Sequence, residues 1–151
     1  MRYTMKTISR LLFEKGGEFW WVSPETMVYD ALKVMADKDV GALMVMEDGK
    51  LIGMFSERDY ARKVILKNKS SKNITVDEIM SSSVISIPPT IDCEQALALM
   101  TAKHIRHLPV LEGETLVGIV SIGDLVKAVI DHEKQINKAL NEYILENKVL
   151  L

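Results

Sequence analysis

The sequence has little of what a disulfide scaffold, a metal centre or a membrane protein needs. Cys93 is the only cysteine among 151 residues, which excludes an internal disulfide and is typical of a reducing compartment. The three histidines, His104, His107 and His132, do not combine with Cys93 at the spacing of a metal site. No apolar run approaches the ~18 residues that span a membrane. These absences indicate an ordinary globular protein.

Loops that bind phosphate in nucleotide-dependent enzymes are also missing. Neither Gly-x-Gly-x-x-Gly nor a Gly-Lys-Ser phosphate loop occurs. Cys93 has no evident base partner that would make it a catalytic thiol. The formal net charge of −2 gives no general attraction to nucleic acid or to anionic membranes, and the N-terminus is too charged for a secretory signal. We therefore expect a non-enzymatic, cytoplasmic protein with no appended catalytic or transport domain.

What the chain does have is an internal duplication. Residues 22–65 align with residues 87–130 at a constant offset of 65 and without a gap, and 14 of the 44 pairs are identical. Most other core-type positions exchange one apolar residue for another, as in Val40 and Ile105. Such self-similarity indicates a duplicated supersecondary unit.

Each copy alternates between strand and helix periodicity, in the order β-α-β-β-α. The pattern predicts helices that start near Val28 and Cys93, and further helices over 59–66 and from Asp124 onward. The predicted strands are residues 19–22, 42–46 and 51–55 in the first copy and 84–87, 107–111 and 116–120 in the second. The fold class is therefore α/β (α+β), with two β-α-β-β-α repeats that we expect to pack about a pseudo-twofold axis.

The predicted domain boundaries follow from this pattern. The first repeat covers 7–66, a polar linker covers 67–73, the second repeat covers 74–131, and a C-terminal helical extension covers 132–151. Apolar residues continue at helical spacing into that extension, with a break at 131–133 that would allow a bend. An apolar stripe of this kind packs either on its own module or on a second subunit.

Both copies end their third strand with the motif Ser-x-x-Asp. The first motif is Ser56–Asp59 and the second motif is Ser121–Asp124. Ser-x-x-Asp before an apolar run is close to a capping box, in which the serine and the acid cap a helix start. A hydroxyl and a carboxylate at a helix start could equally hold a nucleotide. The two interpretations are compatible.

Two β-α-β-β-α units that each end in Gly-h-h-Ser-x-x-Asp, where h is apolar, resemble a tandem cystathionine-β-synthase (CBS) domain pair, also called a Bateman module. The resemblance covers roughly residues 7–131 and includes Val76-x-x-Ile79-Met80 before the second unit and the segment 105–110. It implies a disc-like pair, commonly dimeric, whose clefts bind adenine nucleotides (AMP, ADP or ATP) and in some members NAD or S-adenosylmethionine.

An adenosine ligand offers a ribose diol, an anionic phosphate and a flat apolar base. We expect the carboxylates of Asp59 and Asp124 to accept from the ribose hydroxyls. The hydroxyls of Ser56 and Ser121 would bond ribose or phosphate. The ligand or a facing strand would approach the backbone closely at the two glycines that precede these motifs, Gly53 and Gly118.

Arg58, Arg106 and His107 are the candidate phosphate ligands, with surface charges and a satisfied histidine as the simpler alternatives. The first copy has Gly41 and Ala42 where the second has Arg106 and His107, so we expect one strong and one weak site. The wall against the base would consist of apolar residues that are, taken singly, more often core, namely Val22, Ala42, Ile85 and Ile87.

The sequence thus predicts a ligand-sensing homodimer that binds an adenine nucleotide or NAD(H) between its repeats and signals to a partner protein. The alternative is a structural interaction module with empty clefts, which works through its C-terminal helix. An enzyme that acts on the nucleotide is a third interpretation, for which the sequence shows no nucleophile or metal cluster.

Overall fold

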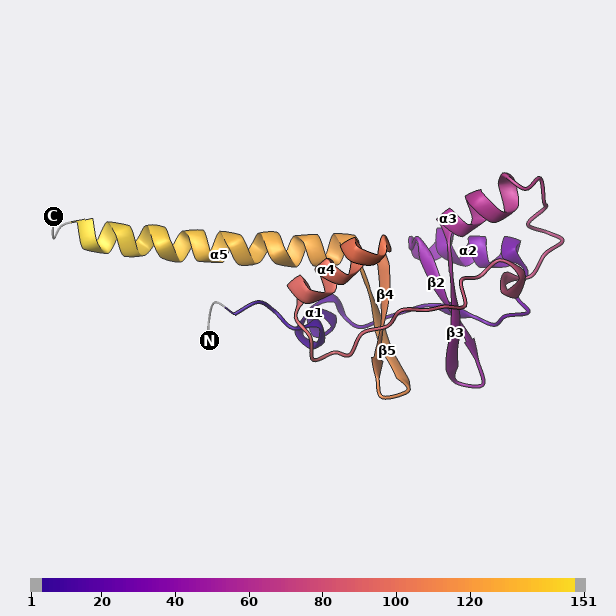
Figure 1. The fold of residues 1–151 in the computed structure, drawn as a ribbon, viewed down its shortest axis with the longest axis horizontal. Helices are drawn as coiled ribbons and strands as arrows, with labels where there is room; N and C mark the ends of the chain where they lie inside the picture. Colours follow the sequence, from indigo (N-terminus) through magenta and orange to yellow (C-terminus); the bar gives the residue numbers. More distant parts are fainter. Residues whose placement is uncertain (1–3, 149–151) are drawn as a thin grey trace. The chain divides into compact units, whose positions relative to one another are not determined.

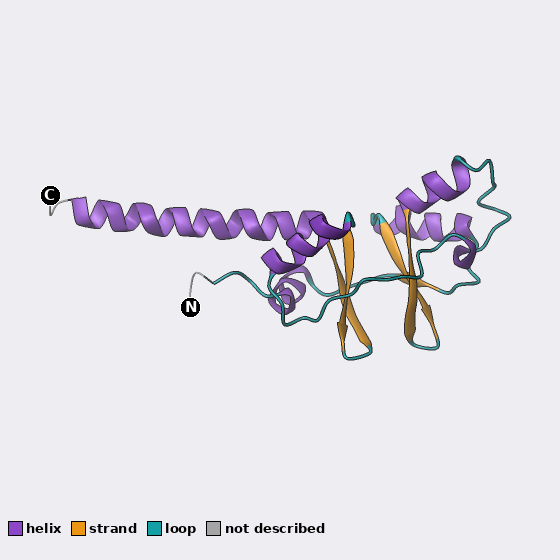
Figure 2. Cartoon of the chain, viewed as in Figure 1, coloured by secondary structure: helices purple, strands orange, loops and turns teal. Residues whose placement is uncertain are grey.

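The computed structural model describes residues 4–148 and repeats one arrangement of helix and hairpin along the chain (Figure 1, Figure 2). Every boundary of this arrangement in the first copy recurs in the second at the constant offset of the sequence repeat. The elements are α2 (Val28–Lys38), β2 (Ala42–Glu47) and β3 (Lys50–Ser56), followed by α4 (Cys93–Lys103), β4 (His107–Glu112) and β5 (Thr115–Ser121). The predicted duplication and the mixed α/β class are confirmed.

The first strand of the first copy is shorter than predicted. In place of a strand over 19–22, β1 (Trp21–Val22) pairs in parallel with β2 at the edge of a sheet of order β1-β2-β3. The backbone N–H of Met44 donates to the carbonyl of Trp20 at 3.3 Å, just before the strand begins. The two-residue strand ends before Pro24, which has no N–H to continue the ladder.

The corresponding strand of the second copy is reduced further. The structure has no strand at 84–87; Ile87 alone forms a parallel bridge with Val110. The N–H of Ile87 donates to the carbonyl of Pro109 at 3.0 Å. Pro109 occupies the position equivalent to Met44 and has no N–H, so the bond that Met44 makes in the first copy is lost here. The prediction of a full strand at 84–87 is therefore wrong.

One compact unit consists of residues 18–86 and 111–118. Its core lies between α2, the sheet and the helical segments that follow β3 and precede the second copy. Phe55 is its largest fully buried side chain. The fully buried members of this core are Val28, Ala31, Leu43, Val45, Phe55, Val64 and Val76.

The helix after β3 changes its winding. It starts as α3 (Glu57–Tyr60), slightly before the predicted start, and continues as one π-helical turn, η1 (Ala61–Ile65). The predicted linker follows as turns, with Asn68 at a positive φ of 56°. A short 3₁₀ helix, η2 (Val76–Glu78), then leads toward the second copy.

The other compact unit consists of residues 4–17, 87–110 and 119–148. Its first helix, α1 (Ile8–Lys15), packs against α4, which lies far from it in the sequence. The N–H of Ile8 donates to the carbonyl of Ile91 at 2.8 Å. The N–H of Cys93 donates to the carbonyl of Lys6 at 2.9 Å. The helix that we assigned to the first repeat is thus bound to the second copy's helix.

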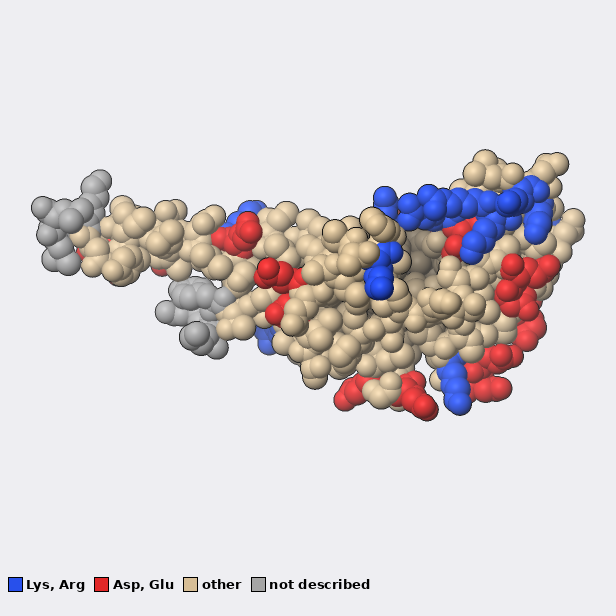
Figure 3. All heavy atoms as spheres, in the orientation of Figure 1, with Lys and Arg blue, Asp and Glu red and all other residues tan. Residues whose placement is uncertain are grey.

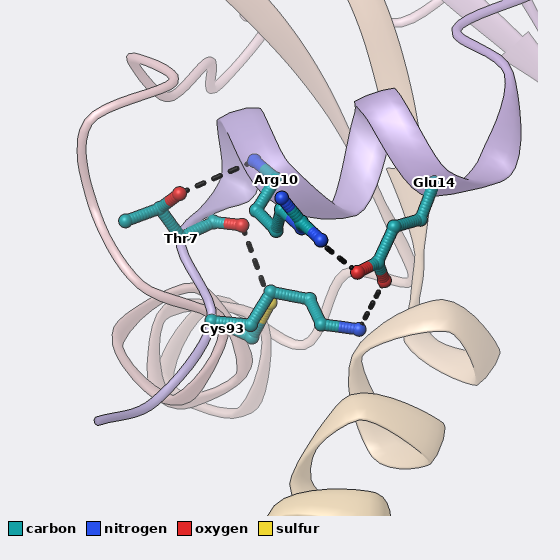
Figure 4. Close-up of polar contacts among 5 residues, drawn as sticks. Thr7, Arg10, Glu14 and Cys93 are labelled. Carbon is teal, nitrogen blue, oxygen red and sulfur yellow. Dashed lines mark hydrogen bonds and ion pairs between the residues drawn. The ribbon is translucent and has the colours of Figure 1, made fainter. Parts of the chain in front are cut away.

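Polar contacts hold the start of α1 in place (Figure 4). The side chain of Thr7 caps the helix by accepting from the N–H of Arg10 at 3.2 Å. The carboxylate of Glu14 pairs with Lys6 and with Arg10. These cations lower the pKa of Glu14, with the hydrogen bond from Lys6 as the largest cause. The apolar face of α1 is buried at Ile8, Leu11 and Leu12.

The last helix, α5 (Ile122–Lys148), extends well beyond the fold of its unit (Figure 1). Its 27 residues correspond to about 40 Å. The helix is continuous through residues 131–133 and shows no bend there in Figure 1, so the bend that the sequence allowed is absent; residues 149–151 of the predicted extension lie outside the described residues. Large apolar side chains that are 40% or more exposed occur along the helix, namely Val126, Ile130, Ile136, Leu140, Tyr143, Ile144 and Leu145, and the last five of them lie in its outer part, after His132.

Within residues 4–148, the structure contains no helix that combines the length and the apolar character needed to cross a bilayer.

Candidate functional site

The first motif caps the start of α3 from the end of β3. The N–H of Asp59 donates to the Ser56 hydroxyl at 3.2 Å, and the N–H of Ser56 donates to Oδ2 of Asp59 at 3.0 Å. These two bonds form a capping box, so the helix start is satisfied within the motif. The side chain of Asp59 remains 16% exposed.

A lysine that the sequence analysis did not single out lies on the first motif. Lys63 Nζ is 3.2 Å from Oδ1 of Asp59 and donates to the carbonyl of Ile79 at 2.9 Å. The lysine therefore connects the motif to the end of η2. The segment after Ile79 also approaches the motif, because Met54 and Ser81 exchange two backbone hydrogen bonds of 2.9 Å each.

The close contact with this segment also explains why residue 53 is a glycine. A Cβ atom at this position would lie 2.5 Å from the Sδ atom of Met80 and 3.0 Å from the backbone oxygen of Ser81. The facing segment, one of the two neighbours that we predicted for this glycine, is thus present in the structure. Its counterpart Gly118 is buried in β5.

The second motif has the same cap but a different cation. The N–H of Ser121 donates to Oδ2 of Asp124 at 2.9 Å, and the N–H of Asp124 donates to the Ser121 hydroxyl at 3.1 Å. Lys15 Nζ, from the last residue of α1, donates to the same Oδ2 at 2.7 Å and to the carbonyl of Ile119 at 3.1 Å. The side chains of Lys15 and Asp124 are 31% and 26% exposed.

The carboxyl group of Asp124 is ionised more readily than usual. Burial, the largest single influence, acts to raise its pKa, but the hydrogen bonds from Lys15 and from Ser121 together outweigh burial and hold the pKa below its ordinary value. The carboxylate is consequently an anionic acceptor that retains partial access to solvent. Such a group can accept hydrogen bonds from a diol or stay paired with an ammonium.

The candidate phosphate ligands lie in different surroundings. Arg58 is exposed on α3, where Lys and Arg side chains gather over α3 and η1 (Figure 3). Arg106 is exposed just before β4, and its carbonyl accepts from the N–H of Ile122 at 2.9 Å. His107 is half-buried at the start of β4. Their role as phosphate ligands stays a prediction.

The predicted wall against the base is mostly core. Val22 and Ala42 are each 7% exposed, and Ile87 is 3% exposed. Val22 belongs to the core cluster around α2. Ile85 is half-buried and is the most accessible of the four. Their burial matches the simpler interpretation, and contact with a base stays a prediction.

Lys15 and Lys63 are the residues that sequence reasoning missed. For Lys63 a local signal existed, because it lies one helical turn after Asp59 on a predicted helix and can reach its carboxylate. For Lys15 the signal was weaker. Lys15 is followed by Gly16 and Gly17, which mark a helix end, but nothing local places that end beside Asp124.

Within residues 4–148, no cluster of potential metal ligands accompanies the two motifs, and the one thiol is unreactive. No group of three potential metal-ligating side chains occurs within the described residues. Cys93 is fully buried at the start of α4, near the carbonyl of Thr7 (Figure 4). Burial raises the pKa of the Cys93 thiol to about 11. This thiol is therefore protonated at neutral pH and is a poor nucleophile.

Comparisons with known proteins point to one family. A family model described as CBS domain matches residues 17–66 and 76–131. The chain is 40% identical over 147 residues to the mitochondrial CBS domain-containing protein CBSX3 of Arabidopsis thaliana, covering 91% of this chain and 71% of CBSX3. It is 38% identical over 104 residues to the CBS domain-containing protein YhcV of Bacillus subtilis, covering 69% of this chain and 74% of YhcV.

Solved structures agree with the sequence comparisons. A protein with CBS domains from Burkholderia ambifaria is 44% identical, with a TM-score of 0.80, and the match covers 83% of this chain and 95% of that protein. The arrangement of helices and hairpins described above is therefore shared with an experimentally determined structure.

Proposed function

This chain belongs to the CBS domain family and carries two CBS domains in tandem, and from that premise we propose that it is a non-enzymatic regulatory module that binds an adenine nucleotide (AMP, ADP, ATP) or NAD(H). Occupancy of the site would be passed to a partner protein. The single unpaired cysteine supports a reducing compartment such as the cytoplasm.

The observation that carries the proposal is the same pairing of groups at both motifs. Each motif presents a partly exposed aspartate carboxylate at a helix start, and a lysine ammonium lies within 3.2 Å of each carboxylate. A carboxylate suits the two ribose hydroxyls, and an ammonium suits a phosphate. A nucleotide carries its ribose hydroxyls and its phosphate close together in one molecule.

The two motifs differ in the origin of the lysine, and this supports unequal sites. Lys63 lies on the same helical segment as Asp59, whereas Lys15 comes from α1. Arg58 and Arg106 add a further difference, since neither has a cationic counterpart in the other copy. We propose that one site binds the nucleotide strongly and the other weakly.

A thermal-shift screen tests the function. A ligand at about 100 times its dissociation constant adds about 2.7 kcal/mol to the unfolding free energy. For a chain of this size the midpoint should rise by roughly 5–11 °C. No rise with any adenine nucleotide, NAD or S-adenosylmethionine at millimolar concentration would refute nucleotide sensing.

Single substitutions then separate the two sites. Asp59→Ala and Asp124→Ala each remove one carboxylate, and Asp37→Ala removes an exposed carboxylate of α2 as the matched control. One of the two motif variants should lose most of the binding measured by calorimetry, and the other should lose little. Equal loss in both, with one ligand bound per chain, contradicts the proposal of unequal, independent sites.

The exposed apolar residues on α5 support a second candidate function. Leu140 and Ile144 are 53% and 52% exposed, and Tyr143 is 63% exposed. A helix face of this kind is typical of a protein–protein contact. We propose that α5 contributes to a homodimer, which either accompanies nucleotide sensing or constitutes the whole function if the sites are empty.

A further inference from the structure

Lys15 reaches Asp124 from a helix that is anchored at its start. Its helix, α1, is fixed to α4 by the bridge between Thr7 and Asp92 and by the bond from the N–H of Ile8 to the carbonyl of Ile91. The backbone of Lys15 is therefore positioned, and only its four-carbon side chain is free to change rotamer. Gly16 and Gly17 follow Lys15 and end the helix. Their φ angles, +99° and +63°, are values that other residues rarely adopt.

In the first copy, the carbonyl equivalent to that of Ile119 is bonded by backbone instead of by a lysine. Met54 on β3 exchanges two hydrogen bonds with Ser81, so the strand edge beside the first motif is closed by main chain. The residue of β5 equivalent to Met54 in the repeat is Ile119, and its carbonyl accepts from Lys15 Nζ at 3.1 Å. A side-chain ammonium can leave this carbonyl without any change of fold, whereas the backbone bridge cannot.

Of the two hydrogen bonds that Lys15 donates, the one to Asp124 is the one that a ligand would disturb. Asp124 is the carboxylate that the proposed function assigns to ribose, and its Oδ2 accepts from Lys15 at 2.7 Å. A ribose diol that approaches this carboxylate must share or replace the lysine. The displaced Lys15 ammonium remains near Asp124, because the backbone of Lys15 does not move. The phosphate of a bound nucleotide would pair with it there.

A nucleoside would lack this compensation. Adenosine has the diol but no anion, so separating Lys15 from Asp124 leaves a partly buried ammonium unpaired and disfavours the complex. A nucleotide supplies a phosphate that would pair with the Lys15 ammonium in place of Asp124. An arrangement of this kind would favour a phosphorylated ligand over a nucleoside at the second motif.

We propose that Lys15 is a phosphate-recognition residue of the Asp124 site, held on Asp124 and on the carbonyl of Ile119 until a phosphorylated ligand displaces it. This inference rests on the proposed function and adds to it the residue that selects for phosphate. Lys15 would then bind the ligand directly, and α1, the helix that carries it, would form part of the ligand site.

The test compares Lys15→Met, which keeps length and removes charge, with Lys15→Arg, which keeps charge, and with the matched control Lys103→Met, which removes an exposed lysine at the end of α4. AMP, adenosine and pyrophosphate are titrated by calorimetry into the full chain of each variant, after circular dichroism confirms folding. Lys15→Met should weaken AMP binding about 10- to 100-fold, the loss of one charged hydrogen-bond partner. It should leave adenosine binding unchanged or tighter.

Lys15→Arg should retain most of the AMP affinity, and Lys103→Met should leave the ratio of AMP to adenosine affinity unchanged. Equal weakening of AMP and adenosine in Lys15→Met overturns the proposal and leaves Lys15 a structural latch. Unchanged AMP affinity overturns it as well.

Pyrophosphate separates this proposal from the proposed function. If the wild-type chain binds no adenine compound but binds pyrophosphate in a Lys15-dependent manner, nucleotide sensing is wrong and phosphate recognition by Lys15 stands. If adenine nucleotides bind without dependence on Lys15, the reverse holds. A wild-type chain that binds neither probe overturns both.

Discussion

A methyl group on Gly53 would lie 2.5 Å from the Sδ atom of Met80. The side chain of Met80 is flexible, but the backbone oxygen of Ser81, at 3.0 Å, is held by its bridge to Met54. Gly53→Ala should therefore lower the unfolding free energy by about 1–3 kcal/mol through overpacking. Urea denaturation measures this, and a loss below about 0.5 kcal/mol would show that the 80–81 segment yields without strain.

Gly123, unlike Gly53, has room for a methyl group. It lies in the first turn of α5, where the nearest side-chain atom to a new Cβ would be Oγ of Ser121 at 3.7 Å, an ordinary contact. Gly123→Ala should raise the unfolding free energy by about 0.5–1 kcal/mol, because alanine loses less conformational freedom in a helix. Destabilisation by this substitution would mean that the start of α5 needs more room than the structure shows.

Acid should weaken the fold partly through Asp124. Its pKa in the folded chain lies below the ordinary value of 3.8, so the folded state binds its proton less readily than the unfolded state does. The contribution is present above that ordinary value and is lost as the pH falls through the lowered folded pKa. Asp124→Asn should flatten the pH dependence of the unfolding free energy below about pH 5.

Glu14 contributes with the same sign, because its pKa is also lowered. The side chain of Glu14 is 39% exposed and that of Asp124 is 26% exposed, so Glu14→Gln should change the acid dependence less than Asp124→Asn does. An acid profile that is identical in the wild type and in Asp124→Asn would contradict the role assigned to the Lys15–Asp124 pair.

Cys93 should resist thiol reagents in the folded chain. Its pKa is raised from 9.0 to about 11, which lowers the thiolate fraction at neutral pH by about 100-fold, and the side chain is fully buried. Labelling with a chromogenic disulfide should be at least that much slower in buffer than in denaturant. Rapid stoichiometric labelling of the native chain would show that the contact between α1 and α4 opens readily.

Truncation after His132 tests the proposed dimer. It removes the outer part of α5, where Ile136, Leu140 and Tyr143 are exposed, and leaves the helix that packs on α4. Light scattering should show a dimer for the full chain and a smaller species for the truncated one. An unchanged dimer would assign association to another surface, and a monomeric full chain would rule out this use of α5.

The repeat made most of the fold predictable from the sequence. Both hairpins and the helices before them were visible because the gapless alignment of the two copies places equivalent apolar positions on equivalent faces. What could not be predicted there was the consequence of a single missing donor. Pro109 looks like a strand residue in the pattern, yet its lack of an N–H leaves one bridge where the first copy has a strand.

The two motifs were predictable only in part. The capping boxes follow from local spacing, and both formed as the sequence analysis described. The partner of Asp124 did not follow, because Lys15 is 109 residues away and only the docking of α1 brings it near. Local patterns specify helices and caps, whereas contacts of this separation depend on packing that a single sequence does not display.

That docking also sets an order of events during synthesis. The bond between Ile8 and Ile91 closes a loop that spans more than half of the chain, which costs more chain entropy than the hairpins do. On the ribosome the first helix has no partner until α4 emerges, while the strands of the first hairpin can already pair. A fragment that starts at the second repeat would lack α1 altogether and would expose the apolar surface that Ile8, Leu11 and Leu12 cover. The second repeat should consequently aggregate when expressed alone, and the N-terminal helix supplied as a separate peptide should rescue it.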